Sequence, residues 1–198
     1  VDVTQMCAPQ VHRASRRPFF AEGFLEQVDG VGEIPDDIKI YAMYGKVGHV
    51  MIRRMPQHAD LRAARYRYLG ADGSDLGEDV APGQRIDSAI QVPDSFPDLI
   101  RIGEHLSRAV GLPFIRVDVY DTVNGPVLGE LTRAPGGRQR YRSDHDQHLG
   151  TMWDLAQYRL DLDVQAGRPL QILHGDHPAE NPYPPETSGR RGPGDREA

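Results

Sequence analysis

Two acidic residues, Asp118 and Glu130, lie in neighbouring runs of apolar and β-branched residues, at 114–120 and 127–131. Asn124-Gly125 separates the runs and is typical of a β-hairpin turn. If residues 123–125 form a three-residue loop with Gly125 left-handed, Thr122 faces Pro126, and Asp118 then lies opposite Glu130. Side chains alternate across a strand, so the pattern predicts one face that carries Arg116, Asp118, Tyr120, Glu130 and Thr132. Val117, Val119 and Leu131 would point into a core.

Two carboxylates that face each other across a hairpin have Cβ atoms about 5 Å apart and repel one another. They therefore need a cation or a shared proton. An oxygen-only set without Cys or His suits Mg²⁺, which prefers a few carboxylates together with substrate phosphates. Thr132 could add a neutral oxygen, and Arg116 offers charge to a phosphate or carboxylate.

A simpler interpretation stays open, because acidic residues on a strand are often just its solvated face. A change of one residue in register would also separate the pair.

The elements that would position this hairpin can be predicted from periodicity. Residues 37–44 and 47–54 favour a second hairpin around Gly45-Lys46, with a possible short strand at 66–69 and another at 18–25. A helix should begin near Asp94 or Ser95 and end at Gly111, with Pro97 in its first turn. Its apolar side would be Leu99, Ile102, Leu106 and Val110. A second helix is expected over 144–165, with Leu149, Met152, Trp153, Leu155, Ala156, Leu160 and Leu162 as its apolar side.

Composition excludes several classes of protein. The chain has 198 residues and a formal net charge of −6, which argues against a nucleic-acid partner. Its single cysteine, Cys7, excludes an intramolecular disulfide, favours the cytoplasm and is not expected to be a nucleophile. No run approaches the roughly 20 apolar residues of a transmembrane helix, and the first residues do not resemble a signal peptide. The Pro- and Gly-rich residues from about 177 onward are expected to be disordered.

Residues 114–137, with the motif FIRVDVY…GELTRAPGG, resemble the metal-binding end of ATP-grasp enzymes, and most closely the TupA-like branch linked to teichuronopeptide and other cell-surface polysaccharide biosynthesis. A second block, IPDDIKIY…GKV at 34–47, supports the resemblance. A third spans Asp146 to Trp153. The blocks occur in the family's order and cover roughly residues 18–155.

The resemblance implies a role for each matching residue. Asp118 and Glu130 would bind Mg²⁺, while Thr132 stands where many ATP-grasp enzymes have a metal-binding Asn. Residues 21–25 would form a hinge against adenine, which makes Glu22, Phe24 and Leu25 nucleotide-binding candidates. Asp37 would lie near the ribose and Lys39 near phosphate. Arg116 and Arg53 would hold the anionic substrate as the candidate catalytic residues, and residues 135–137 would close the site.

Without the family pattern, Glu22, Lys39 and Arg53 would be taken for ordinary strand positions. The run Asp144 to His148 could suggest a metal site, but a charged helix start is the simpler interpretation.

These roles imply an α+β, ATP-grasp fold with antiparallel sheets and flanking helices, which lacks the N-terminal domain and the first half of the nucleotide lobe. We expect a central-lobe remnant at 1–56, a C-terminal lobe with the metal site at 57–167 and a tail at 168–198. The implied activity is ATP- and Mg²⁺-dependent carboxylate–amine ligation through an acyl phosphate. The substrate would be a small molecule, glycan or peptide, and a missing N-terminal portion or a partner chain would complete the enzyme. The alternatives are a non-catalytic nucleotide-fold binding module and an unrelated α+β domain.

Overall fold

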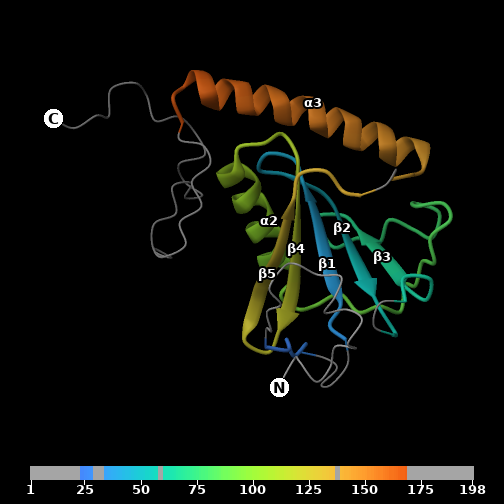
Figure 1. Ribbon diagram of the computed structural model, residues 1–198. Helices are drawn as coiled ribbons and strands as arrows, with labels where there is room; N and C mark the ends of the chain where they lie inside the picture. Colours follow the sequence, from blue (N-terminus) through green and yellow to red (C-terminus); the bar gives the residue numbers. More distant parts are fainter. Residues whose placement is uncertain (1–22, 29–33, 58–59, 137–138, 169–198) are drawn as a thin grey trace, which may run out of the picture.

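The computed structural model describes residues 23–28, 34–57, 60–136 and 139–168, and it has an α+β fold built on one antiparallel sheet (Figure 1). The strands lie in the order β3-β2-β1-β4-β5. The elements are β1 (Asp37–Ala42), β2 (Val47–Arg54), β3 (Arg65–Leu69), α2 (Phe96–Val110), β4 (Ile115–Thr122), β5 (Gly125–Thr132) and α3 (Ser143–Gln165). The fold class predicted from the sequence is therefore confirmed. The domain boundary expected at 56–57 falls between β2 and β3 of this sheet.

Helix α2 covers one face of the sheet and buries the main core. Leu99 of α2 and Ile40, Val50 and Val117 of the central strands are fully buried in this cluster. The helix has Pro97 in its first turn and ends at Gly111, which is left-handed with φ of 70°. These features match the predicted start and stop signals. Ser95 occupies the N-cap position, but its side chain makes no capping hydrogen bond.

Gly103 lets α2 approach β1 closely. A Cβ atom at this position would lie 2.6 Å from Cγ2 of Ile40, a residue with no exposed surface. Gly103→Ala should therefore destabilise the protein by roughly 1–3 kcal/mol through overpacking, less what the better helix propensity of alanine returns. Urea unfolding measures this loss. Gly150→Ala in α3 is the matched control, since its Cβ would meet nothing within 4 Å. Equal stability changes in the two variants would contradict the tight contact.

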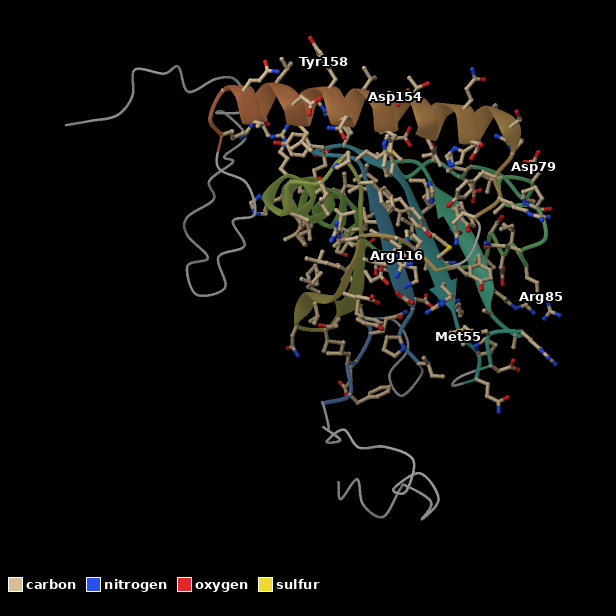
Figure 2. The ribbon with its side chains drawn as sticks, turned by 45° about the horizontal axis from the view of Figure 1, so that its top comes forward. Met55, Asp79, Arg85, Arg116, Asp154 and Tyr158 are labelled. Carbon is tan, nitrogen blue, oxygen red and sulfur yellow. The ribbon has the colours of Figure 1, made fainter. Side chains whose placement is uncertain are left out.

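Helix α3 covers part of the opposite face and crosses the sheet near one end (Figure 1). It buries His145, Leu149, Ala156 and Leu160, which repeat at helical spacing. The predicted apolar side was too broad: Leu155 and Leu162 are about half exposed because they lie around the helix from that stripe. Trp153 is 45% exposed but belongs to the stripe, since its ring stacks on Phe114 with 5.6 Å between the centroids. Asp154 and Tyr158 also point away from the sheet (Figure 2).

The β4–β5 hairpin pairs Asp118 with Glu130 as predicted, but its turn is shorter than expected and it contains a β-bulge. Thr122 pairs with Gly125, not with Pro126, so the turn contains two residues instead of three. The Thr122 side chain holds this turn, because its Oγ1 donates to the Gly125 carbonyl at 2.7 Å and accepts from the Asn124 N–H at 3.2 Å. A β-bulge at Gly129 then restores the missing residue. Asp118 consequently lies opposite Glu130, as predicted.

The N-terminal strand prediction fails where it can be compared. Gly23, Phe24 and Leu25 do not belong to a strand, and the segment instead makes an isolated bridge between Gln27 and Thr122. A lone glycine and the lack of a continuous partner explain why an apolar run does not pair there. Residues 18–22, Cys7 and the tail from 177 lie outside the described residues.

Candidate functional site

The half of the sheet face that α3 leaves uncovered forms the floor of a cavity of about 620 Å³. This volume is in the usual range for small-molecule sites, roughly 300–1,000 Å³. Three segments line the cavity, namely the N-terminal segment, the β1–β2 hairpin and the β4–β5 hairpin. The lining residues are Gly23, Phe24, Leu25, Asp37, Lys39, Arg53, Asp118, Tyr120, Val127, Leu128, Gly129 and Glu130.

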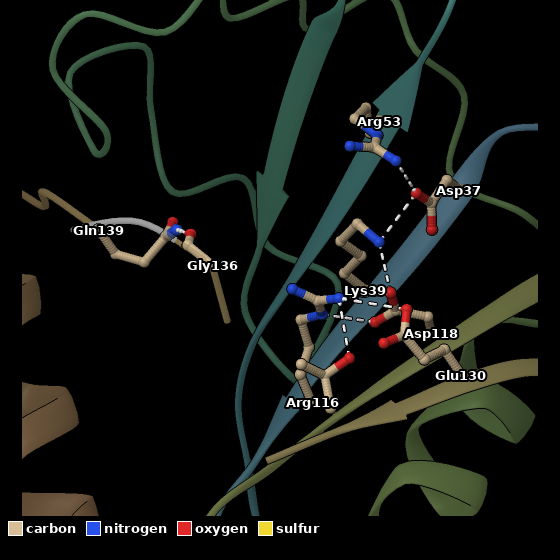
Figure 3. Close-up of polar contacts among 9 residues, drawn as sticks. Asp37, Lys39, Arg53, Arg116, Asp118, Glu130, Gly136 and Gln139 are labelled. Atoms are coloured by element: carbon tan, nitrogen blue, oxygen red, sulfur yellow. Dashed lines mark hydrogen bonds and ion pairs between the residues drawn. The ribbon is translucent and has the colours of Figure 1, made fainter. Parts of the chain in front are cut away.

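The floor of the cavity is a chain of alternating charges that runs across β2, β1 and β4 (Figure 3). Arg53 Nη2 lies 2.5 Å from Asp37 Oδ2, and Lys39 Nζ lies 2.9 Å from the same oxygen. Lys39 also donates a short hydrogen bond to Asp118. The sheet register explains the proximity, because Asp37 pairs with Arg53 and Lys39 pairs with Asp118.

Arg116 completes the charge chain at its β4 end. Its Nε and Nη2 donate to the two oxygens of Asp118 at 2.6 and 2.7 Å, a bidentate pair. The side chains of Asp118 and Arg116 are 6% and 12% exposed, so water screens this pair little. Burial opposes the charged form of Arg116, but the hydrogen bonds and charge of Asp118 raise the pKa of Arg116 overall.

Glu130 and Thr132 lie on the same face but differ from the expected metal ligands in their partners. Glu130 is 63% exposed, and its Oε2 is 3.9 Å from Arg116 Nη2. Thr132 Oγ1 accepts a hydrogen bond from Arg116 at 3.0 Å. The two carboxylates therefore share a face, with a guanidinium beside them. In the described ranges, no group of three or more His, Cys, Asp or Glu side chains could hold a metal ion.

Mg²⁺ is nevertheless chemically compatible with this pair. It commonly takes one or two protein carboxylates and fills its remaining positions with water and phosphate oxygens. Asp118 and Glu130 would supply those carboxylates, and both line the cavity. Thr132 is less suitable as a third ligand, since its hydroxyl is engaged by Arg116.

Seven of the ten residues singled out from the sequence line this one cavity. They are Phe24, Leu25, Asp37, Lys39, Arg53, Asp118 and Glu130. Arg116 and Thr132 lie beside it, bonded to Asp118 or to each other. Glu22 lies outside the described residues. Pro135 and Gly136, which were expected to close the site, are not among the lining residues.

Sequence reasoning missed the apolar wall of the cavity, to which Val127 and Leu128 contribute. The bulge at Gly129 is responsible for Val127, because it pairs Val127 with Tyr120 and so breaks the predicted alternation. Leu128 lies two residues before Glu130, and alternation alone would have placed it on this face. A glycine within a strand is the one sequence signal that could have revealed the bulge. A Cβ at Gly129 would lie 2.9 Å from Tyr120 Cε2, so a side chain at this position would force the Tyr120 ring to move.

The covered half of the same face holds a second polar group, a buried cluster of His49, His145, Tyr41 and Tyr141. His145 Nε2 lies 3.2 Å from His49 Nδ1, and the Tyr141 hydroxyl lies 3.4 Å from His49 Nε2. The rings of Tyr41 and His49 stack at 4.2 Å between centroids. Burial, together with the smaller effect of the neighbouring His145, lowers the pKa of His49 from 6.5 to about 3. The run at 144–148 is the start of α3, in agreement with the simpler interpretation of the sequence, and it contributes His145 to this packing.

The His49 pKa predicts an acid-labile fold. Between pH 6.5 and about 3 the unfolded chain binds a proton at this position that the folded chain does not, so stability falls as the pH is lowered through this window. The slope is at most about 1.4 kcal/mol per pH unit for this residue. His49→Phe, which keeps a ring on Tyr41, should unfold with a shallower pH dependence in urea titrations at pH 4 to 7. Parallel curves for the two proteins would contradict this assignment.

Comparison with protein families decides which family the cavity and its motifs belong to. The model of the TupA-like ATP-grasp family matches residues 26–153, which is more than half of the chain. The chain belongs to the TupA-like ATP-grasp family. The matched range contains the described strands, α2 and the start of α3.

A solved structure and the curated proteins were also compared with this TupA-like chain. The structure is the ATP-grasp ligase PsnB complexed with a phosphomimetic variant of its minimal precursor, Mg and ADP. It shares 17% sequence identity and a TM-score of 0.31, and the match covers 61% of this chain and 34% of PsnB. The TupA-like chain thus spans about a third of the length of that ligase. No curated protein matched it.

Among the described helices, none combines the length and apolarity needed to cross a bilayer.

Proposed function

We propose that this TupA-like chain carries the nucleotide- and magnesium-binding half of an ATP-dependent carboxylate–amine ligase. The observation that supports it best is the cavity, which gathers residues of three separate segments: the N-terminal segment, the β1–β2 hairpin and the β4–β5 hairpin. Its lining combines apolar side chains, such as Phe24 and Leu128, with the charged floor. A nucleotide has the same two parts, a flat base and an anionic phosphate chain.

The charged residues divide the work of phosphoryl transfer in this proposal. Lys39 and Arg53 bind the phosphate chain, and Arg116 offers its charge to a phosphate or to the carboxylate of the acid. Asp118 and Glu130 hold Mg²⁺, which supplies charge neutralisation at the transferring phosphoryl group. Phe24 and Leu25 contact the base, and Asp37 lies toward the ribose. Positioning of this kind is most of what a protein contributes to such a reaction.

The reaction joins a carboxylate to an amine in two steps. The carboxylate oxygen attacks the γ-phosphorus of ATP, ADP leaves, and an acyl phosphate forms. The amine nitrogen then attacks the acyl carbon, phosphate leaves, and the amine gives up a proton. We place this chemistry in cell-surface polysaccharide or teichuronopeptide biosynthesis, on the cytoplasmic side where ATP is available. The acid and the acceptor are a small molecule, glycan or peptide.

Calorimetric titration with ADP tests the nucleotide part of the proposal. We expect heat of binding in the presence of MgCl₂, and much weaker binding when EDTA replaces the metal. A full-length protein that gives no heat under either condition would contradict it. Release of ADP from ATP when candidate acids and amines are added then tests the ligase part.

A non-catalytic binding module is the second candidate, and the hydrogen bond from Arg116 to Thr132 favours it. That bond engages the oxygen expected to be a third metal ligand. Such a module would bind ADP and Mg²⁺ without releasing ADP from ATP, whichever acid and amine are added.

A further inference from the structure

Asp118 is already engaged by two positive charges. Its oxygens accept hydrogen bonds from Lys39 Nζ and from both Nε and Nη2 of Arg116. The three side chains are between 6% and 12% exposed. Glu130, the other candidate ligand, is mostly exposed and lies 3.9 Å from Arg116. The metal pair therefore consists of one neutralised buried carboxylate and one solvated carboxylate.

A divalent cation at Asp118 would compete directly with those two side chains. It would face their repulsion in a poorly screened site, where charges interact more strongly than in water. Mg²⁺ also gives up its water reluctantly. The single solvated carboxylate of Glu130 offers little compensation. Asp118 is a poor metal ligand as long as Lys39 and Arg116 remain on it.

A bound phosphate chain would offer Lys39 and Arg116 another partner and so free Asp118 for a cation. Guanidinium and ammonium groups form charge-assisted hydrogen bonds with phosphate oxygens as readily as with carboxylates. The cavity also contains buried polar atoms that find no hydrogen-bond partner in the described structure, namely Asp37 Oδ1 and Arg53 Nε. These atoms belong to the same charge chain, and buried polar groups in proteins are normally paired. Arg53 Nε can therefore donate to a phosphate oxygen of a ligand, whereas Asp37 Oδ1 can accept from a ligand hydroxyl group.

We propose that Lys39 and Arg116 gate Asp118, so that it becomes a metal ligand only when a polyphosphate draws them away. The inference rests on the proposed function. The metal and the nucleotide then bind as a mutually dependent pair, because each raises the affinity of the other by the same factor. Asp37 keeps Arg53 as a partner when Lys39 moves, so the exchange leaves no carboxylate of the floor unpaired.

Mn²⁺ provides a direct probe, since the electron spin resonance signal of free Mn²⁺ reports how much is bound. With full-length wild-type protein we expect Mn²⁺ to bind at least tenfold more weakly alone than in the complex with saturating ADP, after correction for Mn²⁺ held by free ADP. Lys39→Met and Arg116→Met should each bind Mn²⁺ alone at least fivefold more tightly than the wild type. Both variants should bind ADP more weakly. Circular dichroism verifies that they fold.

Arg67→Met is the matched control, because Arg67 pairs with Asp75 away from the cavity. Its affinity for Mn²⁺ should equal that of the wild type. If Mn²⁺ alone binds the wild type as tightly as it does with ADP, the gate is overturned. Unchanged Mn²⁺ affinity in both variants overturns it as well. ADP binding in these cases would leave the proposed function standing, whereas no ADP binding by the wild type would overturn both.

Discussion

Asp118→Asn is expected to abolish magnesium-dependent ADP binding. Asparagine keeps the shape of the side chain but removes the negative charge that a divalent cation needs. Changes in the outer shell of metal sites already cost about 10–100-fold in affinity, so the loss of a direct ligand should cost at least as much. Calorimetric titration of ADP with MgCl₂ measures the effect. The matched control is Asp121→Asn, on the same strand but outside the cavity lining, which should bind like the wild type.

Glu130→Gln separates a metal effect from a folding effect. Asp118→Asn also weakens the pairing of two buried cations, so lost binding could reflect lost structure. Glu130 is 63% exposed, and its replacement should leave the unfolding midpoint unchanged while it weakens ADP binding in MgCl₂. If both variants bind Mg²⁺ and ADP as well as the wild type does, the assignment of the metal to this pair is wrong.

Asp37→Ala is expected to cause the largest loss of stability. The Asp37 side chain is 9% exposed and accepts from both Arg53 and Lys39. Removing one partner from a buried charge network typically costs about 3–5 kcal/mol, because it leaves uncompensated charge. Urea unfolding measures this loss. Asp154→Ala, at an exposed position of α3, should stay within about 0.5 kcal/mol of the wild type.

A second substitution tests whether charge is the cause. Adding Arg53→Met to Asp37→Ala removes the cation that has lost its carboxylate, so part of the stability should return. If the double variant is as unstable as the sum of the single variants, the two residues act independently. The loss in Asp37→Ala would then not come from the uncompensated charge of Arg53.

The sequence was sufficient to predict most of the sheet, because alternation and turn residues are local signals. β1, β2, β4 and β5 lie where apolar alternation placed them, and α2 ends at Gly111 as its glycine predicts. The pairing of Asp118 with Glu130 was also predicted, although through two compensating errors. The turn is one residue shorter than expected, and the bulge at Gly129 adds one residue back.

The contacts between distant strands could not be predicted in the same way. The pairing of β1 with β4 brings Lys39 to Asp118 across 79 positions of sequence, and no local pattern encodes it. The family resemblance grouped these residues, but it did not indicate that Asp118 would be held by two cations. The burial of His49 beneath α3 was missed for a related reason, since it depends on which half of the sheet the helix covers.

The glycine bulge has a consequence for protein engineering. Because the register changes by one residue at Gly129, the turn length alone does not determine which acidic side chains meet. A hairpin of this sequence that kept its turn but lost the bulge would pair Asp118 with Gly129 and turn Glu130 to the other face of the ribbon. The smallest portable unit of the acidic pair is therefore the whole stretch from Arg116 to Thr132, in which the bulged residue matters as much as the turn.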